Sequence, residues 1–246
     1  MTSNFPLPSP RLLDAGEGAL VVEFGTVVDP DISDRVLALD IALNQLALAG
    51  VRETVPTYRS LMIHYDPLRL ERADLIAAVK TIEAAPHARH IPANRWTIPC
   101  CYDVQHGEDL GQIAEMTGLS TERAISLHAG ATYRVYMFGF APGFCYLGGL
   151  PPELAVSRRA TPRPPTPPNV VTIGGGLALV TTVSMPTGWW LIGRTPERIF
   201  SPAREPNFLV AVGDALRFEP IDRTTFDSLE TRAAAGEIVA RRERLA

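Results

Sequence analysis

The feature that most constrains the fold is a series of short β-forming runs, separated by glycine and proline, that begins at Thr132. Each run is rich in Val, Ile, Thr, Tyr, Phe or Trp, the residues that strands favour. Evenly spread short strands with turn residues between them are typical of a β-barrel or a β-sandwich. The sequence therefore predicts a mainly-β domain in the C-terminal part of the chain. The runs are TYRVYMFGF, NVVTIGG, LALVTTV, WWLIG and ALRFEPI.

The N-terminal part of the chain follows a different pattern. Apolar residues at three- and four-residue steps predict two helices, and three β-rich runs predict strands, in the order strand, helix, strand, strand, helix. This order predicts an α+β layer with the helices on one face of a mainly antiparallel sheet. A connector rich in Pro and Ala follows, so we place the domain boundary near Asn94, with an α+β domain over 1–94 and a β-barrel domain over 95–246. The predicted elements are strands at 18–24, 51–55 and 60–66 and helices at 32–46 and 71–85.

Three further helices are expected within the second domain. After a strand WTIPCCY, the segments DLGQIAEMTG and STERAISLHAG predict two short helices, with Ser120 as the N-cap of the second because its hydroxyl can accept a bond from a helix amide. The last residues, 222–246, predict a closing helix with mixed charge on its solvent face.

Composition excludes several classes of protein. The 246 residues are 46% hydrophobic and 20% charged, which is typical of a soluble globular chain. A net charge of −4 argues against a nucleic-acid-binding protein, whose partner would require a basic face. No apolar run approaches the roughly 18 residues that span a bilayer, so we expect a cytoplasmic protein without a membrane partner. The three cysteines predict reduced thiols, since a chain of this size needs no disulfide.

The segment GFAPGFCYLGG contains closely spaced glycine and proline among aromatic residues. Glycine allows backbone geometry that a Cβ would obstruct, and proline restricts the turn. One interpretation is a rigid turn whose four aromatic rings fill the barrel. The other is a wall of a ligand cleft with backbone amides that meet an anion. The residues concerned are Phe138, Gly139, Phe140, Pro142, Gly143, Phe144 and Tyr146.

Two arginine-containing segments follow this turn. In SRRATPRPPTPP, prolines stiffen the loop and would fix the direction of Arg163, whereas Arg158 and Arg159 fit a solvated loop equally well. In PTGWWLIGRTP, Arg194 follows Gly193 and precedes Thr195 at a strand end, where it could point into a cleft or form a structural ion pair. Guanidinium groups so held could bind a carboxylate or phosphate through charge-assisted hydrogen bonds.

Three weaker features complete the set of candidates. His87 and His90 have a spacing seen in metal sites, but two ligands do not complete one, and we expect no metal. Cys145 and His128 could form a thiolate pair, but no third group orients them, which favours a packed thiol. The run GGG at 174–176 lacks the Lys-Ser/Thr of a phosphate-binding loop.

Three segments taken together resemble one family. YRVYMFGFAPGFCYLGGL, RRATPR and GWWLIGRTP, in this order and at these separations, are similar to the family of the B-type subunit of 5-oxoprolinase, also called allophanate hydrolase subunit 1 and related to the histidine-kinase inhibitor KipI. The similarity extends from IPCCYD to VGDALRFEPI, and the N-terminal part fits more loosely. The resemblance implies an N-terminal α+β domain, a C-terminal cyclophilin-like barrel and a homologous partner, which is named subunit 2 or the C-type subunit.

The resemblance also implies a chemistry. Relatives act in ATP-driven opening of the 5-oxoproline lactam, or in carboxyl transfer from biotin to urea, so this chain is expected to be an enzyme subunit that acts on a small amide with ATP, or with biotin on a partner. An amide resists hydrolysis because its C–N bond has partial double-bond character. We expect Arg163 and Arg194 to clamp an anion and His128 to make a polar or proton-transfer contact. Substrate contacts are expected from Phe138, Gly139, Pro142, Gly143, Gly193 and Thr195. The alternative is a regulatory binding protein of the kinase-inhibitor type.

Four positions depart from the family pattern. Leu177 and Ala178 stand where relatives commonly have Gln and Thr, so two polar contacts to an amide are missing. Asn169 and Thr187 each replace a common Gly. Because the loss of polar groups changes specificity strongly, the identity of the amide does not follow from the resemblance.

Overall fold

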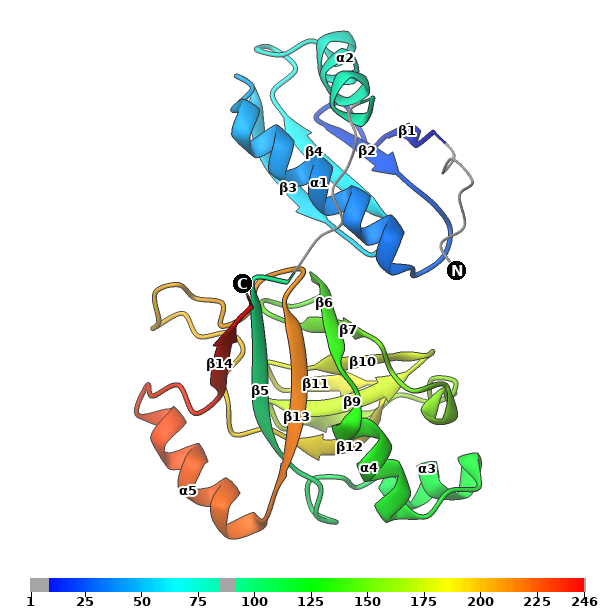
Figure 1. Cartoon of the computed structure of the whole chain (residues 1–246), viewed down its shortest axis with the longest axis vertical. Coiled ribbons are helices and arrows are strands. Elements are labelled where there is room, and N and C mark those ends of the chain that lie inside the picture. The colour runs from blue at the N-terminus through cyan, green and yellow to red at the C-terminus, as the bar shows by residue number, and fades with distance from the viewer. Residues whose placement is uncertain (1–8, 85–91, 246) are drawn as a thin grey trace. The chain divides into compact units, whose positions relative to one another are not determined.

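The computed structural model describes residues 9–84 and 92–245 of the chain. Contacts between residues divide the chain into two compact units, 1–90 and 91–246, which are described separately (Figure 1). Among the described residues, no helix combines the length and the apolar character needed to cross a lipid bilayer. The segment with His87 and His90 lies outside the described residues.

The N-terminal unit is a four-stranded antiparallel sheet packed against helices. The strand order is β1-β2-β4-β3, and α1 contacts β3, β4 and α2 (Figure 1). The expected strands and helices are present, and the sheet has one more edge strand than expected. The elements are β1 Arg11–Asp14, β2 Ala19–Glu23, α1 Pro30–Leu46, β3 Val51–Pro56, β4 Ser60–Tyr65 and α2 Arg72–Glu83.

Alternation of apolar residues explains this packing. On β2 and β4, every second side chain is buried against the helices, because successive residues of a strand point to opposite faces. Asp29 begins α1, since its carboxylate accepts from the amides of Asp31 and Ile32. The helix ends at Ala47, which has a left-handed φ of 47°.

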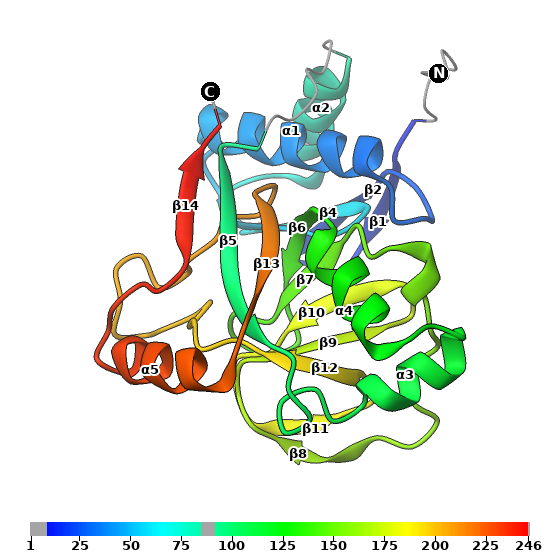
Figure 2. The same cartoon turned by 60° about the horizontal axis from the view of Figure 1, so that its bottom comes forward.

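The C-terminal unit contains a closed barrel, as predicted, and this barrel has seven strands. The hydrogen-bonded order is β12-β9-β10-β7-β6-β13-β5, and a β12–β5 pairing closes the ring (Figure 2). The β13–β5 pair is parallel and the other pairs are antiparallel. The strands are β5 Asn94–Cys101, β6 Tyr133–Phe138, β7 Cys145–Gly148, β9 Val170–Gly174, β10 Leu177–Val180, β12 Trp190–Arg194 and β13 Ala215–Ile221.

Helices and a β-ribbon surround the barrel. Ser120 caps α4 by accepting from the amide of Arg123, as predicted. The ribbon of β8 and β11 is separate from the barrel sheet. These elements are α3 Leu110–Thr117, α4 Thr121–Gly130, the short 3-10 helix η1 Pro152–Leu154, β8 Arg163–Thr166, β11 Met185–Thr187 and α5 Arg223–Ala234.

The prediction of one closing helix over 222–246 is wrong at its C-terminal end. Helix α5 ends at Ala234, and Gly236 has a φ of 93°, a left-handed conformation that glycine adopts readily and that terminates helices. Residues Arg241–Arg244 then form β14, which pairs with β5 at the edge of the sheet.

The aromatic residues of the turn do not all fill the barrel. Phe138 packs against the barrel core, but Phe140 is 80% exposed. Phe144 is buried with Leu179 and Trp189 in a separate cluster on the outer face of the barrel wall. The reason is again strand alternation, because Ala178 and Val180 of β10 enter the barrel core and Leu179 points the other way.

Candidate ligand pocket

The three segments that carry the family resemblance line one pocket. Its volume is about 340 Å³, and it lies beside the outer apolar cluster of the barrel. The turn 138–149, the loop 157–163 and the segment 185–189 all contribute, together with β10 and the residue after it. The lining residues are Phe140, Phe144, Tyr146, Arg158, Arg159, Ala160, Pro162, Leu179, Thr181, Met185, Pro186, Thr187, Gly188 and Trp189.

The inner wall of this pocket is aromatic. Tyr146 and Trp189 meet edge to face, with ring centroids 6.2 Å apart. Phe144 and Leu179 are almost fully buried beside them. Such rings provide flat apolar surfaces, and a planar ligand can stack on them.

Two arginines border the pocket, and both lie over tryptophan rings. The guanidinium carbon of Arg158 is 4.7 Å from the ring centroid of Trp189, and that of Arg159 is 4.6 Å from the centroid of Trp190. A guanidinium over an aromatic face is attracted by the ring and is held in a defined direction. The pocket therefore combines aromatic walls with fixed positive charge. The sequence alone fits a solvated loop and an anion-binding role equally well for Arg158 and Arg159.

Asp109 holds the loop 157–163, called the arginine loop here, through ion pairs. Its side chain is 5% exposed, and its Oδ1 accepts from Arg163 at 2.9 Å and from Arg159 at 3.3 Å. Its Oδ2 accepts from the amide of Leu191 at 2.7 Å. One buried carboxylate thus connects the start of α3, the arginine loop and β12. Sequence analysis missed this residue, because nothing local marks it as a partner of arginines about 50 residues later.

Arg163 and Arg194, the two arginines expected to clamp an anion, do not line the 340 Å³ pocket. Arg163 is bound by Asp109 and, at 3.1 Å, by Glu108. Arg194 donates to Glu230 at 2.6 Å and to the carbonyl of Pro168 at 3.2 Å. Arg194 lines a second pocket, of about 210 Å³, and Arg163 lines neither of the two. Their role as anion clamps stays a prediction, and each forms a structural ion pair.

The expected contacts in the turn have packing roles. The amide of Gly139 donates to the carbonyl of Phe144, and the carbonyl of Pro142 accepts from the hydroxyl of Thr182. Gly143 has a φ of 74°, and a Cβ at this position would lie 2.1 Å from the Cβ of Phe200. The turn therefore requires glycine at 143 whether or not it touches a ligand.

The remaining expected contacts lie at the ends of β6 and β12. Phe138 packs on Phe208, with centroids 4.7 Å apart. A Cβ on Gly193 would lie 2.7 Å from Cys100 Sγ, so glycine is needed where β12 meets β5. Thr195 is fully buried, and its hydroxyl accepts from the amide of Glu197. None of these three lines either pocket, and their contacts with a substrate stay predictions.

His128 lies in the core of the second unit. Its Nδ1 is 2.8 Å from the hydroxyl of Tyr102, and its ring stacks on Phe218. Burial lowers the pKa of His128 from its usual value near 6.5 to about 3, so the ring is neutral at neutral pH. A role in proton transfer stays a prediction, and the position of the ring indicates packing.

Acid should destabilise this unit through His128. Its pKa is depressed in the folded state, so the unfolded chain binds one more proton between about pH 6 and pH 3. Stability present above the unfolded pKa is therefore lost as the pH falls, by about 1.4 kcal/mol per pH unit at most. Urea unfolding of the wild type and His128→Gln at pH 7 and pH 4.5 should show a smaller pH dependence for the variant. His64→Gln, on β4, should retain the wild-type pH dependence.

The glycine run at 174–176 forms a hairpin turn. Gly175 and Gly176 have φ values of 61° and 78° and connect the antiparallel strands β9 and β10. This is the geometry of a two-residue hairpin loop and not of a phosphate-binding loop.

Three of the four departures from the family pattern have structural reasons. Asn169 has a φ of 62°, a left-handed conformation that Asn adopts more readily than most residues other than Gly. The hydroxyl of Thr187 accepts from the amide of Trp189. Ala178 is fully buried in the barrel core, where a polar side chain would be costly.

Comparison with known proteins identifies the family. Residues 10–210 match the family described as "Carboxyltransferase domain, subdomain C and D". The chain is a member of this family. The B-type subunit of 5-oxoprolinase from Bacillus subtilis (strain 168) is 32% identical over 222 residues, which are 86% of this chain and 92% of that protein. The resemblance to this type of 5-oxoprolinase subunit is therefore confirmed at the level of the family.

Two solved structures show a similar fold. The crystal structure of TTHA0988 has a TM-score of 0.74 at 34% identity, over 83% of this chain and 40% of that chain. Urea carboxylase from Kluyveromyces lactis has a TM-score of 0.79 over the whole of this chain and 25% of its own, but at 17% identity it supports the fold alone. This chain thus spans less than half of either protein.

Proposed function

We propose that this chain is the B-type subunit of a heteromeric, ATP-dependent amidohydrolase that opens a small amide bearing a carboxylate. The observation that carries this proposal is the pocket in which the three family segments meet, with aromatic walls and two arginines at its border. The family membership and the naming of its relatives as 5-oxoprolinase subunits of the B type support the reaction class.

The composition of the pocket favours one kind of amide. A planar amide can stack on Tyr146 and Trp189, and its carboxylate can pair with Arg158. 5-Oxoproline and allophanate carry such a carboxylate, whereas urea does not. Arg159 is bound to Asp109, which leaves Arg158 as the more available of the two cations.

The chain would bind and orient the amide, and a homologous partner would complete the site. ATP, when bound by the complex, supplies phosphorylation of the amide oxygen, which makes the carbon electrophilic. We assign ATP and any biotin to the partners, and this chain's part is to hold the substrate carboxylate and to keep water from its aromatic wall. The cyclophilin-like classification of the barrel and the cytoplasmic location belong to the same proposal.

Replacement of Arg158 tests the proposal. In a complex of this chain with its C-type partner and the remaining component of the enzyme, we expect Arg158→Ala to raise the KM for 5-oxoproline about tenfold to a hundredfold, because a charge-assisted bond is worth about 1.5–3 kcal/mol. The measurement is 5-oxoproline-dependent ATP hydrolysis, repeated with allophanate and urea. Arg232→Ala, which removes an exposed cation of α5, should behave as the wild type. A stable complex that turns over none of the three amides would refute the proposal.

A second function is supported by Phe140. This ring is 80% exposed at the pocket border, and its φ of 70° is uncommon for a bulky residue. An exposed aromatic beside a groove is a frequent anchor in protein interfaces, as a regulator of the kinase-inhibitor type would need. A histidine kinase that binds the wild type but not Phe140→Ala, with no amide turnover in any complex, would favour this function.

A further inference from the structure

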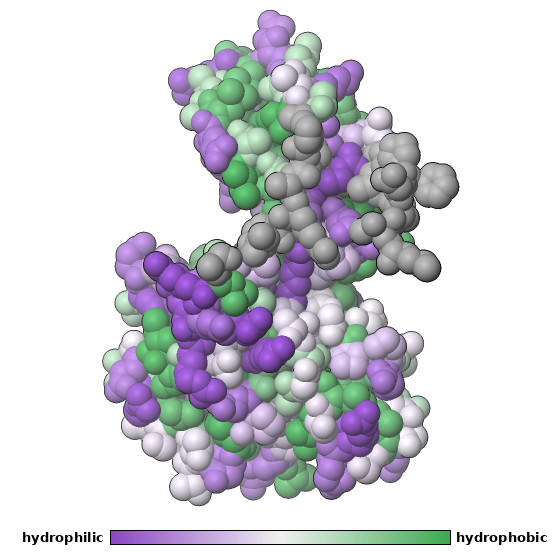
Figure 3. Space-filling model, in the orientation of Figure 1, coloured by the Kyte–Doolittle hydropathy of each residue, from purple (hydrophilic) through white to green (hydrophobic). Residues whose placement is uncertain are grey.

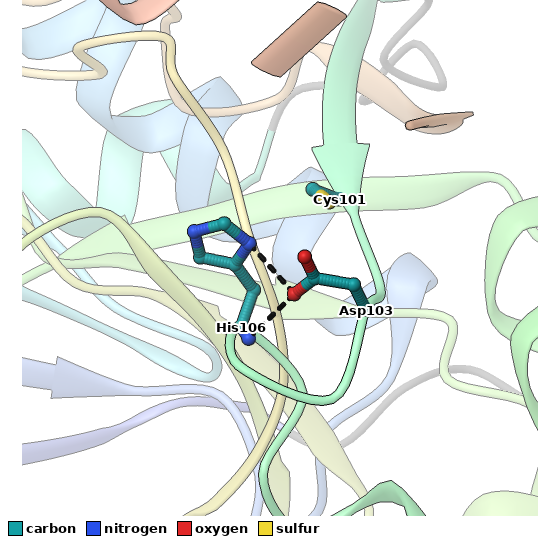
Figure 4. A group of neighbouring side chains, drawn as sticks. All are labelled: Cys101, Asp103 and His106. Carbon is teal, nitrogen blue, oxygen red and sulfur yellow. Dashed lines mark hydrogen bonds and ion pairs between the residues drawn. The ribbon is translucent and has the colours of Figure 1, made fainter. Parts of the chain in front are cut away.

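A cysteine, an aspartate and a histidine meet at the end of β5, outside the pocket described above. Cys101 is the last residue of the strand, and Asp103 and His106 lie in the turn that follows (Figure 4). One ligand atom from each of the three lies within 4.8 Å of the others. Because strand residues alternate, Cys100 enters the barrel core and Cys101 lies on the opposite face.

The turn holds these groups rigidly. Asp103 Oδ1 accepts from the amides of Gln105 at 3.1 Å and His106 at 2.8 Å. The carbonyl of Asp103 accepts from the amides of His106 and Gly107. A Cβ on Gly107 would lie 2.5 Å from the carbonyl oxygen of Ile192, so the turn packs tightly on β12. The side chains are therefore fixed before any ligand arrives.

The histidine has an unsatisfied nitrogen that faces the cluster. His106 is 7% exposed, and its ring packs on Phe226, with centroids 4.3 Å apart. Its Nδ1 lies 2.8 Å from Asp103 Oδ1, an ion-pair contact that Figure 4 draws as a dashed line, but no described residue gives this nitrogen a well-aligned hydrogen bond. A buried polar atom without a hydrogen-bond partner is costly and needs an explanation. A proton on Nδ1 can lie between these two atoms, and a metal ion bound there would replace that proton.

Neighbouring arginines do not fully neutralise the carboxylate of Asp103. Arg223 Nη1 is 3.6 Å from Asp103 Oδ2, too far for a hydrogen bond, and Arg223 Nε donates to Asp227 at 2.9 Å. Arg194, the other cation near the ring, is paired with Glu230 at 2.6 Å. Arg223 thus lies closer to Asp227 and to the amide oxygen of Gln105 than to Asp103, and Arg194 has its ion pair with Glu230.

We propose that Cys101, Asp103 and His106 form a binding site for a zinc ion. A thiolate, an imidazole and a carboxylate are the ligand types that Zn²⁺ takes, and a thiolate favours it over Mg²⁺ or Ca²⁺. Binding forms an Sγ–Zn bond and releases the thiol proton to solvent, so the thiolate and the carboxylate balance the charge of the ion. Three protein ligands leave one coordination position, and His106 also lines the second pocket, of about 210 Å³.

Cobalt provides a direct test of this site on the full chain. Co²⁺ replaces Zn²⁺ in such sites and gives a thiolate-to-metal charge-transfer band in the near ultraviolet. We expect one equivalent of Co²⁺ to produce this band in the wild type, and Zn²⁺ to displace it. Cys101→Ser should lose the band, whereas Cys145→Ser, at a buried thiol of the barrel core, should keep it.

Thermal unfolding with ZnCl2 gives a second readout, which is the Tm and not the charge-transfer band of the thiolate. Zn²⁺ should raise the Tm of the wild type and of His64→Gln, but not that of His106→Gln, because binding to the folded state alone stabilises it. A wild-type chain that gives no charge-transfer band with Co²⁺ would overturn the proposal. So would a band that survives in Cys101→Ser and disappears in Cys145→Ser. Since amide turnover is not measured, these results are independent of the proposed function.

Discussion

Asp109→Asn is expected to destabilise the barrel unit by about 3 kcal/mol, because loss of a buried anion leaves its cations without compensation. The Asp109 carboxylate is 5% exposed and accepts from Arg159, Arg163 and the amide of Leu191. Asparagine keeps the shape of the side chain but removes the charge, so the effect reports the ion pairs and not a cavity. Urea unfolding followed by tryptophan fluorescence measures the change.

Glu108→Gln is the matched control for this variant. Glu108 also contacts Arg163, at 3.1 Å, but its side chain is 53% exposed. Exposed ion pairs contribute about 0–1 kcal/mol, so this variant should unfold close to the wild type. If the two variants lost the same stability, Asp109 would not be the residue that holds the arginine loop.

Gly143→Ala should also cost about 3 kcal/mol, for a steric reason. The new Cβ would lie 2.1 Å from the Cβ of Phe200, and the φ of 74° disfavours any L side chain. Neither atom is the free end of a flexible chain, so the turn itself must move. The midpoint of urea unfolding should fall accordingly.

Gly111→Ala separates this steric effect from the general effect of alanine. Gly111 lies in α3, and a Cβ there would meet no atom within 4 Å. Alanine is favoured over glycine in helices, so Gly111→Ala should be neutral or stabilising by up to about 1 kcal/mol. Equal destabilisation by both substitutions would contradict the packing of Gly143 on Phe200.

The sequence predicts most of the barrel strands, because β-forming runs and turn residues are local signals. These signals fit a sandwich as well as a barrel, and it is the family resemblance that implies the barrel. It also leads to the three segments that line the pocket. The sequence favours Arg163 and Arg194 over Arg158 and Arg159, which border the pocket, because the carboxylate partners of Arg163 and Arg194 lie far away in the chain. Arg163 is held by the carboxylates of Glu108 and Asp109.

Other features have no local signal at all. Asp109 and the group of Cys101, Asp103 and His106 depend on how the end of β5 meets β12 and α5. Strand β14 follows a helix in a charged, non-alternating segment, RRER, which resembles a solvated helix end. The pairing with β5, and not propensity, makes it a strand.

The charges of β14 have a consequence for behaviour at high concentration. All four of its residues are exposed, and hydrophilic side chains gather over this strand (Figure 3). A sheet edge offers unpaired amides and carbonyls to other chains, and arginines along it discourage such pairing. Strand β14 thus occupies the hydrogen-bonding edge of β5. The charges of its arginines disfavour pairing with a second copy of the strand, which should reduce intermolecular aggregation.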